Sequence, residues 1–178
     1  MRISKKLVAC IAMVLTACMM LSACGIGASV NNVVSAENGG AEGKIGTTFR
    51  TVFFDYSVDS VDYPSEYEGY TASEGMQLLD VVVTIKNTFG STLPMFNDDF
   101  QIQWHDLGDG DDDYDFGIIM DDSSTVMPYE YSLANGKTCN YHIIYEVPAE
   151  ATEFSVSFQE FFDDNTMGDV FFTYFSKK

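Results

Sequence analysis

The chain has few basic residues: nine Lys and Arg stand against 27 Asp and Glu in 178 residues, which gives a formal net charge of −18. Such a protein repels the phosphates of nucleic acids and the anionic headgroups of lipids. We therefore exclude nucleic-acid binding, and contact with a membrane cannot depend on the protein's charge. Hydrophobic residues still make up 46% and aromatic residues 14% of the chain, which predicts a packed core rather than an acidic disordered tail.

Histidine is also scarce, and the other parts of a recognisable zinc or catalytic site are missing. His105 and His142 are the two histidines of the chain, whereas a zinc site needs three or four nitrogen or sulfur ligands. No serine lies in a Gly-x-Ser-x-Gly motif. We predict that the protein is not an enzyme. A site of dispersed carboxylates is the weaker alternative, because acids are too abundant here to mark one.

Cysteine is limited to four residues, and one of them ends a targeting signal. Basic residues at positions 2–6, an uncharged apolar run over residues 7–21 and small residues before Cys24 are the parts of a secretory signal. The sequence Leu21-Ser22-Ala23-Cys24 resembles the lipobox of bacterial lipoproteins, in which the cysteine receives a diacylglyceryl group before the peptide is cut ahead of it. The resemblance implies a helical signal peptide over residues 1–23 and a lipid-anchored protein on the outer side of the bacterial cell membrane.

A retained transmembrane helix over residues 7–30 is the alternative to cleavage, since about 20 apolar residues span a bilayer. The small residues around Cys24 favour cleavage, and both readings place the rest of the chain outside the cytoplasm. Removal of residues 1–23 leaves six Lys and Arg against 27 acids, a net charge of −21. Cys139 is then the remaining unmodified cysteine, so we expect no intramolecular disulfide and a buried, unreactive thiol.

Residues 24–47 are rich in Gly, Ser, Asn and Ala, which predicts a flexible tether with a reach of about 25 Å. From residue 48 to 178, apolar and polar residues alternate with the period of two that is typical of strands. The pattern is clearest over residues 54–59, 79–86, 100–105, 154–159 and 170–175. Asn135-Gly136 predicts a type I′ hairpin turn. Six or more short strands without a helical stretch predict an all-β, antiparallel β-sandwich.

Three segments of this domain carry a family resemblance. They are the long strand that ends in Asn87, the segment Asp99-Phe100-Gln101-Ile102, and the turn Asn135-Gly136-Lys137-Thr138 that leads to a strand ending in Val147-Pro148. Over residues 48–175 they resemble a widespread uncharacterised domain of bacterial lipoproteins. The resemblance implies an immunoglobulin-like, telokin-like fold and no catalytic residues. The acidic insertion after Trp104 departs from the common pattern.

The acidic insertion has alternating carboxylates that can converge on calcium, which takes six to eight oxygen ligands: Asp109, Asp111, Asp113 and Asp115. The match to a helix-loop-helix calcium loop fails, because its sixth position is Tyr114 rather than Gly and its twelfth is Met120 rather than Glu. A solvated hairpin tip is the alternative. An acidic calcium-binding module is thus the second functional hypothesis.

Aromatic residues fall on both faces of the predicted strands, although only one face of a sandwich sheet meets the core. We predict that some of them form an exposed binding surface, with these candidates: Tyr63, Tyr67, Tyr70, Phe53 and Phe171. Loops that fold back over the outer face are the alternative. The leading hypothesis is a monomeric, non-catalytic binding domain for a protein, peptide or envelope component, without a cofactor beyond the covalent lipid. Its acidity favours a cationic partner.

Overall fold

The computed structural model describes residues 33–107 and 114–178, and strands are the dominant regular structure in them. One short 3-10 helix, η2 (Asn97–Asp99), is also present. The strands in chain order are β1 (Val33–Ser35), β2 (Gly40–Lys44), β3 (Thr48–Arg50), β4 (Phe54–Asp62), β5 (Met76–Asn87), β6 (Leu93–Phe96), β7 (Phe100–Trp104), β8 (Tyr114–Phe116), β9 (Glu130–Leu133), β10 (Thr138–Pro148), β11 (Glu153–Phe161) and β12 (Met167–Ser176).

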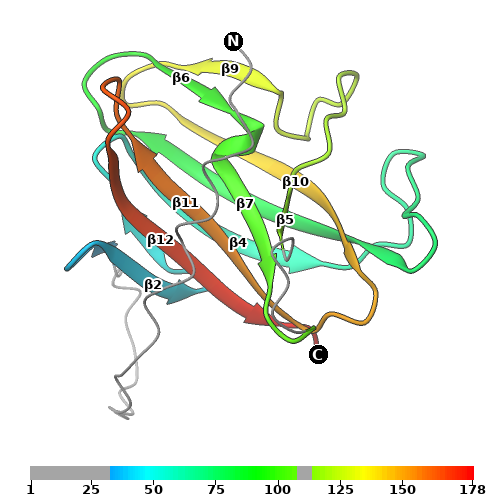
Figure 1. The fold of residues 1–178 in the computed structure, drawn as a ribbon. Coiled ribbons are helices and arrows are strands. Elements are labelled where there is room, and N and C mark those ends of the chain that lie inside the picture. The colour runs from blue at the N-terminus through cyan, green and yellow to red at the C-terminus, as the bar shows by residue number, and fades with distance from the viewer. Residues whose placement is uncertain (1–32, 108–113) are drawn as a thin grey trace, which may run out of the picture. The chain divides into compact units, whose positions relative to one another are not determined.

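These strands form two five-stranded sheets and a two-stranded one. The first sheet has the order β1-β3-β4-β5-β10, the second has the order β2-β12-β11-β7-β8, and β6 pairs with β9. Figure 1 shows β7, β11 and β12 lying over β4, β5 and β10. The arrangement is the all-β sandwich that the period-two pattern predicts.

The two larger sheets enclose one apolar core, to which each strand contributes the side chains of one face. The ring of Tyr56 on β4 lies 5.3 Å from Phe100 on β7 and 5.9 Å from Phe158 on β11. The alternate residues from Leu79 to Ile85 on β5 are fully buried in the same core. The alternation predicted for residues 54–58, 79–85 and 154–158 is therefore confirmed.

The sandwich begins earlier than the sequence analysis places it. Strand β1 pairs in parallel with β3, and β2 pairs in parallel with β12. Residues 33–47 thus belong to the sheets rather than to a tether, because edge strands are held by backbone hydrogen bonds and need few apolar side chains. Residues 24–32 of the predicted tether, the signal peptide and the lipidation site Cys24 lie outside the described residues.

The Asn135-Gly136 segment forms a turn but not the predicted hairpin. A type I′ turn requires a positive φ at both central residues. Gly136 has a φ of 73°, but Asn135 is not among the residues with positive φ. The strands on either side have different partners, since β9 pairs with β6 and β10 pairs with β5. The Asn87 side chain links these parts by donating to the carbonyl oxygens of Ser91 and Leu133 at 2.8 and 2.7 Å.

No helix in residues 33–107 and 114–178 is long and apolar enough to cross a bilayer.

Candidate functional site

Two of the predicted binding tyrosines, Tyr67 and Tyr70, hold the connection between β4 and β5 against the outer face of the first sheet. The Tyr67 hydroxyl lies 3.2 Å from the Thr125 hydroxyl. The Tyr70 hydroxyl donates to Glu146 Oε2 at 2.6 Å, and the backbone N–H of Ser73 donates to Glu146 Oε1, also at 2.6 Å. These hydrogen bonds hold the pKa of Glu146 below its ordinary value. Both tyrosines are partly buried, so they anchor the loop.

A second, small apolar cluster lies beneath this loop. It consists of the buried residues Leu78, Val126 and Ile144, and the following residues pack against it: Tyr67, Tyr70, Ala72, Ile118 and Met120. Two connections, residues 63–75 and 117–126, therefore fold back over the outer face of the first sheet. Loops that fold back in this way are the alternative that the sequence left open to an exposed aromatic binding surface.

The three other predicted binding residues lie elsewhere. Phe171 is buried in the core beside Tyr56, so the prediction that it contributes to a surface is wrong. The ring of Phe53 is half-buried between the exposed rings of Phe89 and Phe162, at 5.5 and 5.6 Å. These three rings form an apolar group at one end of the sandwich.

Tyr63 packs against the core at the opposite end of β4. Its ring centroid lies 6.2 Å from that of Phe154, and the Lys177 Nζ lies 5.2 Å from the Tyr63 centroid. Burial raises the pKa of Tyr63 to about 12. Among the described residues its hydroxyl has no hydrogen-bond partner, which marks the ring as a packing element.

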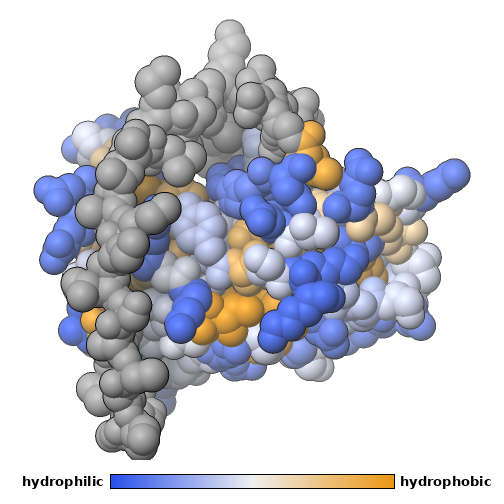
Figure 2. Space-filling model, turned by 90° about the horizontal axis from the view of Figure 1, so that it is seen from below, coloured by the Kyte–Doolittle hydropathy of each residue, from blue (hydrophilic) through white to orange (hydrophobic). Residues whose placement is uncertain are grey.

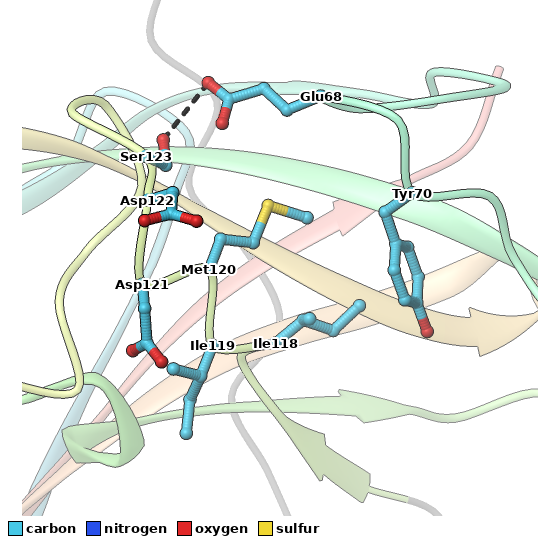
Figure 3. Close-up of a pocket in the computed structure, with 8 residues that line it drawn as sticks. All are labelled: Glu68, Tyr70, Ile118, Ile119, Met120, Asp121, Asp122 and Ser123. Carbon is cyan, nitrogen blue, oxygen red and sulfur yellow. Dashed lines mark hydrogen bonds between the residues drawn. The ribbon is translucent and has the colours of Figure 1, made fainter.

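A shallow depression of about 280 Å³ opens between the connection over residues 117–123 and the loop that holds the tyrosines. Figure 3 shows Glu68 and Ser123 joined across one side of it, where the Ser123 hydroxyl donates to Glu68 Oε1 at 3.1 Å. Asp121 and Asp122 lie together on the opposite side from Tyr70. Its lining residues are Glu68, Tyr70, Ile118, Ile119, Met120, Asp121, Asp122 and Ser123.

An adjoining depression of about 310 Å³ shares Ile119, Met120, Asp121 and Ser123 with the first and adds Pro128, Tyr129 and Glu130. We call the two together the acidic depression. Ile119 and Tyr129 are 50% and 53% exposed, which is high for large apolar side chains. The charged residues that line it are all acidic, and the sequence contains no Lys or Arg between Lys86 and Lys137.

An Asp-His pair lies next to this region and was missed by the sequence analysis. His142 Nδ1 on β10 lies 2.8 Å from Asp80 Oδ1 on β5. Burial raises the pKa of Asp80, and the hydrogen bond to His142 opposes that rise. In serine hydrolases, an Asp-His pair works together with a serine hydroxyl that hydrogen-bonds to the second ring nitrogen of the histidine. In the described part of the chain, no side-chain hydroxyl forms a hydrogen bond with His142. The pair depends on strand register, which local sequence does not reveal.

The predicted calcium ligands are mostly outside the described residues, which include Asp115 but not Asp109, Asp111 or Asp113. Asp115 is exposed on β8. Within residues 33–107 and 114–178, no group of three or more His, Cys, Asp or Glu side chains can hold a metal ion. Calcium binding by the acidic insertion therefore stays a prediction.

Solved structures show where this fold occurs. The candidate lipoprotein ycdA of Bacillus subtilis is 17% identical, with a TM-score of 0.55 over 72% of this chain and 38% of that chain. The chain thus shares its fold with part of ycdA. An uncharacterised β-sandwich protein of Clostridium difficile 630 is 16% identical, with a TM-score of 0.45 over 78% of this chain and 96% of that one. No protein-family model and no curated protein matches the chain.

Proposed function

We propose that this protein is a lipid-anchored, extracytoplasmic, non-catalytic domain that binds a cationic protein or peptide of the cell envelope through the acidic depression. The observation that carries the proposal is the exposure of Ile119 and Tyr129 among carboxylates without a basic residue between them. Exposed apolar side chains on a soluble domain favour a binding surface. A rim of like charges favours a partner that combines apolar side chains with positive charge.

The charge of the whole molecule supports the same choice of partner. The net charge, −18 for the full chain and −21 without residues 1–23, attracts a cationic partner over distances limited by salt, about 8 Å at physiological ionic strength. Most described residues on the face in Figure 2 are hydrophilic, with the apolar residues confined to smaller areas.

The proposed anchor would keep the domain near the membrane. Eight residues lie between Cys24 and Val33, the first residue of β1, and the nine steps from one Cα to the other span about 30 Å in a fully extended chain. A lipid on Cys24 would thus hold the sandwich within that distance of the bilayer. One structural neighbour, ycdA, is itself described as a candidate lipoprotein, which supports this location.

The proposal is tested by cross-linking in intact cells. A photoreactive amino acid replaces Ile119 in the acidic depression, and in a control chain it replaces Asn165, which is exposed in the connection between β11 and β12 of the second sheet. We expect one or a few adducts with basic envelope proteins from position 119 and not from position 165.

A further inference from the structure

Large apolar side chains gather on connections at one end of the sandwich. The Thr88 N–H donates to the Phe53 carbonyl oxygen at 3.3 Å, and the Phe53 ring lies 5.6 Å from that of Phe162. Five of the eleven large hydrophobic residues that are exposed in the described part of the chain lie here: Val52, Phe89, Phe161, Phe162 and Met167. We call these five residues and the half-buried Phe53 the apolar tip. Figure 1 shows the connection between β11 and β12, which carries Phe162, at one end of the second sheet.

Hydrogen-bonded backbone presents the side chains of the apolar tip to solvent. The buried carboxylate of Glu160 accepts from the N–H groups of Val52 and Asp169, at 2.7 and 3.1 Å, and so joins the connection over residues 51–53 to β12. Phe161 and Met167 lie opposite each other where β11 pairs with β12. None of the six tip side chains carries a charge or a hydroxyl group. They can therefore enter hydrocarbon without the cost of an unsatisfied polar group, and exposed apolar groups of this kind mark contacts with proteins or membranes.

The end of the sandwich that carries the tip is neutral, although the protein is acidic. Four connections meet there, over residues 51–53, 88–92, 134–137 and 162–166. In them and in the strand residues on either side, two charged residues are basic and two are acidic: Arg50, Lys137, Asp163 and Asp164. The net charge of −18 is therefore carried by other parts of the chain. An end with balanced charges can approach lipid headgroups without the repulsion that this net charge causes.

The proposed lipid lies within reach of the same region. The register of β1 places Val33 opposite Thr48, which is four residues before Val52 and thus at most about 14 Å from it along the sheet. A fully extended chain from Cys24 to Val33 spans about 30 Å. A lipid on Cys24 and the apolar tip can therefore enter the same bilayer. Because the lipid already holds the domain at the surface, the high local concentration of lipid would favour even weak insertion of the tip.

We propose that the apolar tip inserts into the headgroup region of the bilayer to which the chain is anchored. The rings of Phe89 and Phe162 would enter about 5–10 Å, to the boundary between headgroups and acyl chains. Insertion would give the domain a fixed orientation on the membrane, which a single point of lipid attachment does not provide. A cationic protein is a poorer fit, because the neutral tip does not offer an excess of carboxylates. The proposal rests on the proposed anchor but not on the partner of the acidic depression.

Fluorescence quenching from within the bilayer tests the proposal on the full-length protein. A fluorescent amino acid replaces Phe89 in one chain and Glu74 in a control chain, and each protein is recovered from cell membranes and reconstituted into phosphatidylcholine vesicles. Glu74 is exposed beyond the other end of β5, whose 12 residues span about 37 Å. A doxyl group near the headgroup end of the acyl chain quenches fluorophores that enter the bilayer. We expect it to quench position 89 at least about threefold more than position 74.

Paired serine substitutions separate the tip from other exposed apolar residues. Phe161→Ser with Phe162→Ser should lower the quenching at position 89 to about the level at position 74. Ile119→Ser with Tyr129→Ser removes two exposed apolar side chains from the acidic depression and should leave the quenching at position 89 unchanged. All four side chains are exposed, so both variants should unfold in urea near the wild-type midpoint, which checks that they fold.

Three results would overturn the proposal. Equal quenching at positions 89 and 74, in vesicles that carry the protein, would show that the tip stays outside the bilayer while the anchor holds. If position 89 is instead shielded from aqueous iodide as the protein density rises, without quenching by the lipid, a second copy of the chain covers the tip. Protein that does not float with the vesicles would refute the anchor and this proposal together. The partner of the acidic depression is tested separately, by the adducts from position 119.

Discussion

Asp99 should make the stability of this protein fall as the pH rises from acid to neutral. Its carboxylate closes η2 by accepting a hydrogen bond from the Phe96 N–H at 2.9 Å. Burial nevertheless raises the pKa of Asp99 to about 7, with a further contribution from the neighbouring charge of Asp98. The hydrogen bond from Phe96 acts in the opposite direction and is outweighed.

The direction of the effect follows from the two pKa values. An unfolded Asp has a pKa of about 3.9, so between about pH 4 and pH 7 the folded protein binds a proton that the unfolded chain does not. The stabilisation is fully present below the unfolded pKa and is lost as the pH rises through the folded pKa. A difference of about three pKa units, at about 1.4 kcal/mol each, amounts to about 4 kcal/mol.

Urea unfolding of the wild type and of Asp99→Asn, at steps between about pH 4 and pH 8, measures this effect. Asparagine cannot ionise, yet its carbonyl oxygen can still accept from the Phe96 N–H. The variant should therefore gain stability relative to the wild type as the pH rises, by about 4 kcal/mol near neutrality. Repulsion among the other carboxylates is common to both proteins and cancels. An unchanged difference between pH 4 and pH 7 would refute the reasoning.

Three further predictions concern single side chains. Glu160→Ala should lower the free energy of unfolding by about 3 kcal/mol in urea, because the buried carboxylate accepts two backbone hydrogen bonds at 2.7 and 3.1 Å; an unchanged midpoint would contradict this. Tyr70→Phe should raise the pKa of Glu146 towards its ordinary value, since it removes the hydrogen bond that lowers that pKa most, and NMR titration of the carboxyl group would detect a failure to shift. Cys24→Ala should abolish lipid labelling and release the protein from membranes, and membrane fractionation that finds it still bound would count against the anchor.

The strands could be predicted where one face is apolar and the other polar, as on β4 and β5. The strand predicted over residues 170–175 is confirmed as part of β12. Its core face was not predictable, because Val170, Phe172 and Tyr174 alternate with Phe171, Thr173 and Phe175, and both sets contain aromatic residues. Period alone cannot tell which set faces the core. The structure resolves the ambiguity, since Phe171 is buried in the core and Tyr174 is exposed.

The acidic depression could not be predicted for a different reason. Its residues come from connections about 55 positions apart, as the hydrogen bond between Glu68 and Ser123 shows. No local pattern encodes such a contact, which depends on how two loops pack on Leu78 and Ile144. The acidity, which led us to propose a cationic partner, could be read from composition, but the location of the surface could not.

Matched removal of charge is the most direct test of whether the carboxylates of the acidic depression recognise a cationic partner. Asp121→Asn with Asp122→Asn removes two charges from the depression, and Glu74→Gln with Glu150→Gln removes two from exposed positions outside its lining. The yield of the adduct from position 119 is then compared between the two variants. We predict a loss of about tenfold for the aspartate pair and little change for the glutamate pair. Equal loss in both variants, or no loss in either, would contradict the proposed recognition.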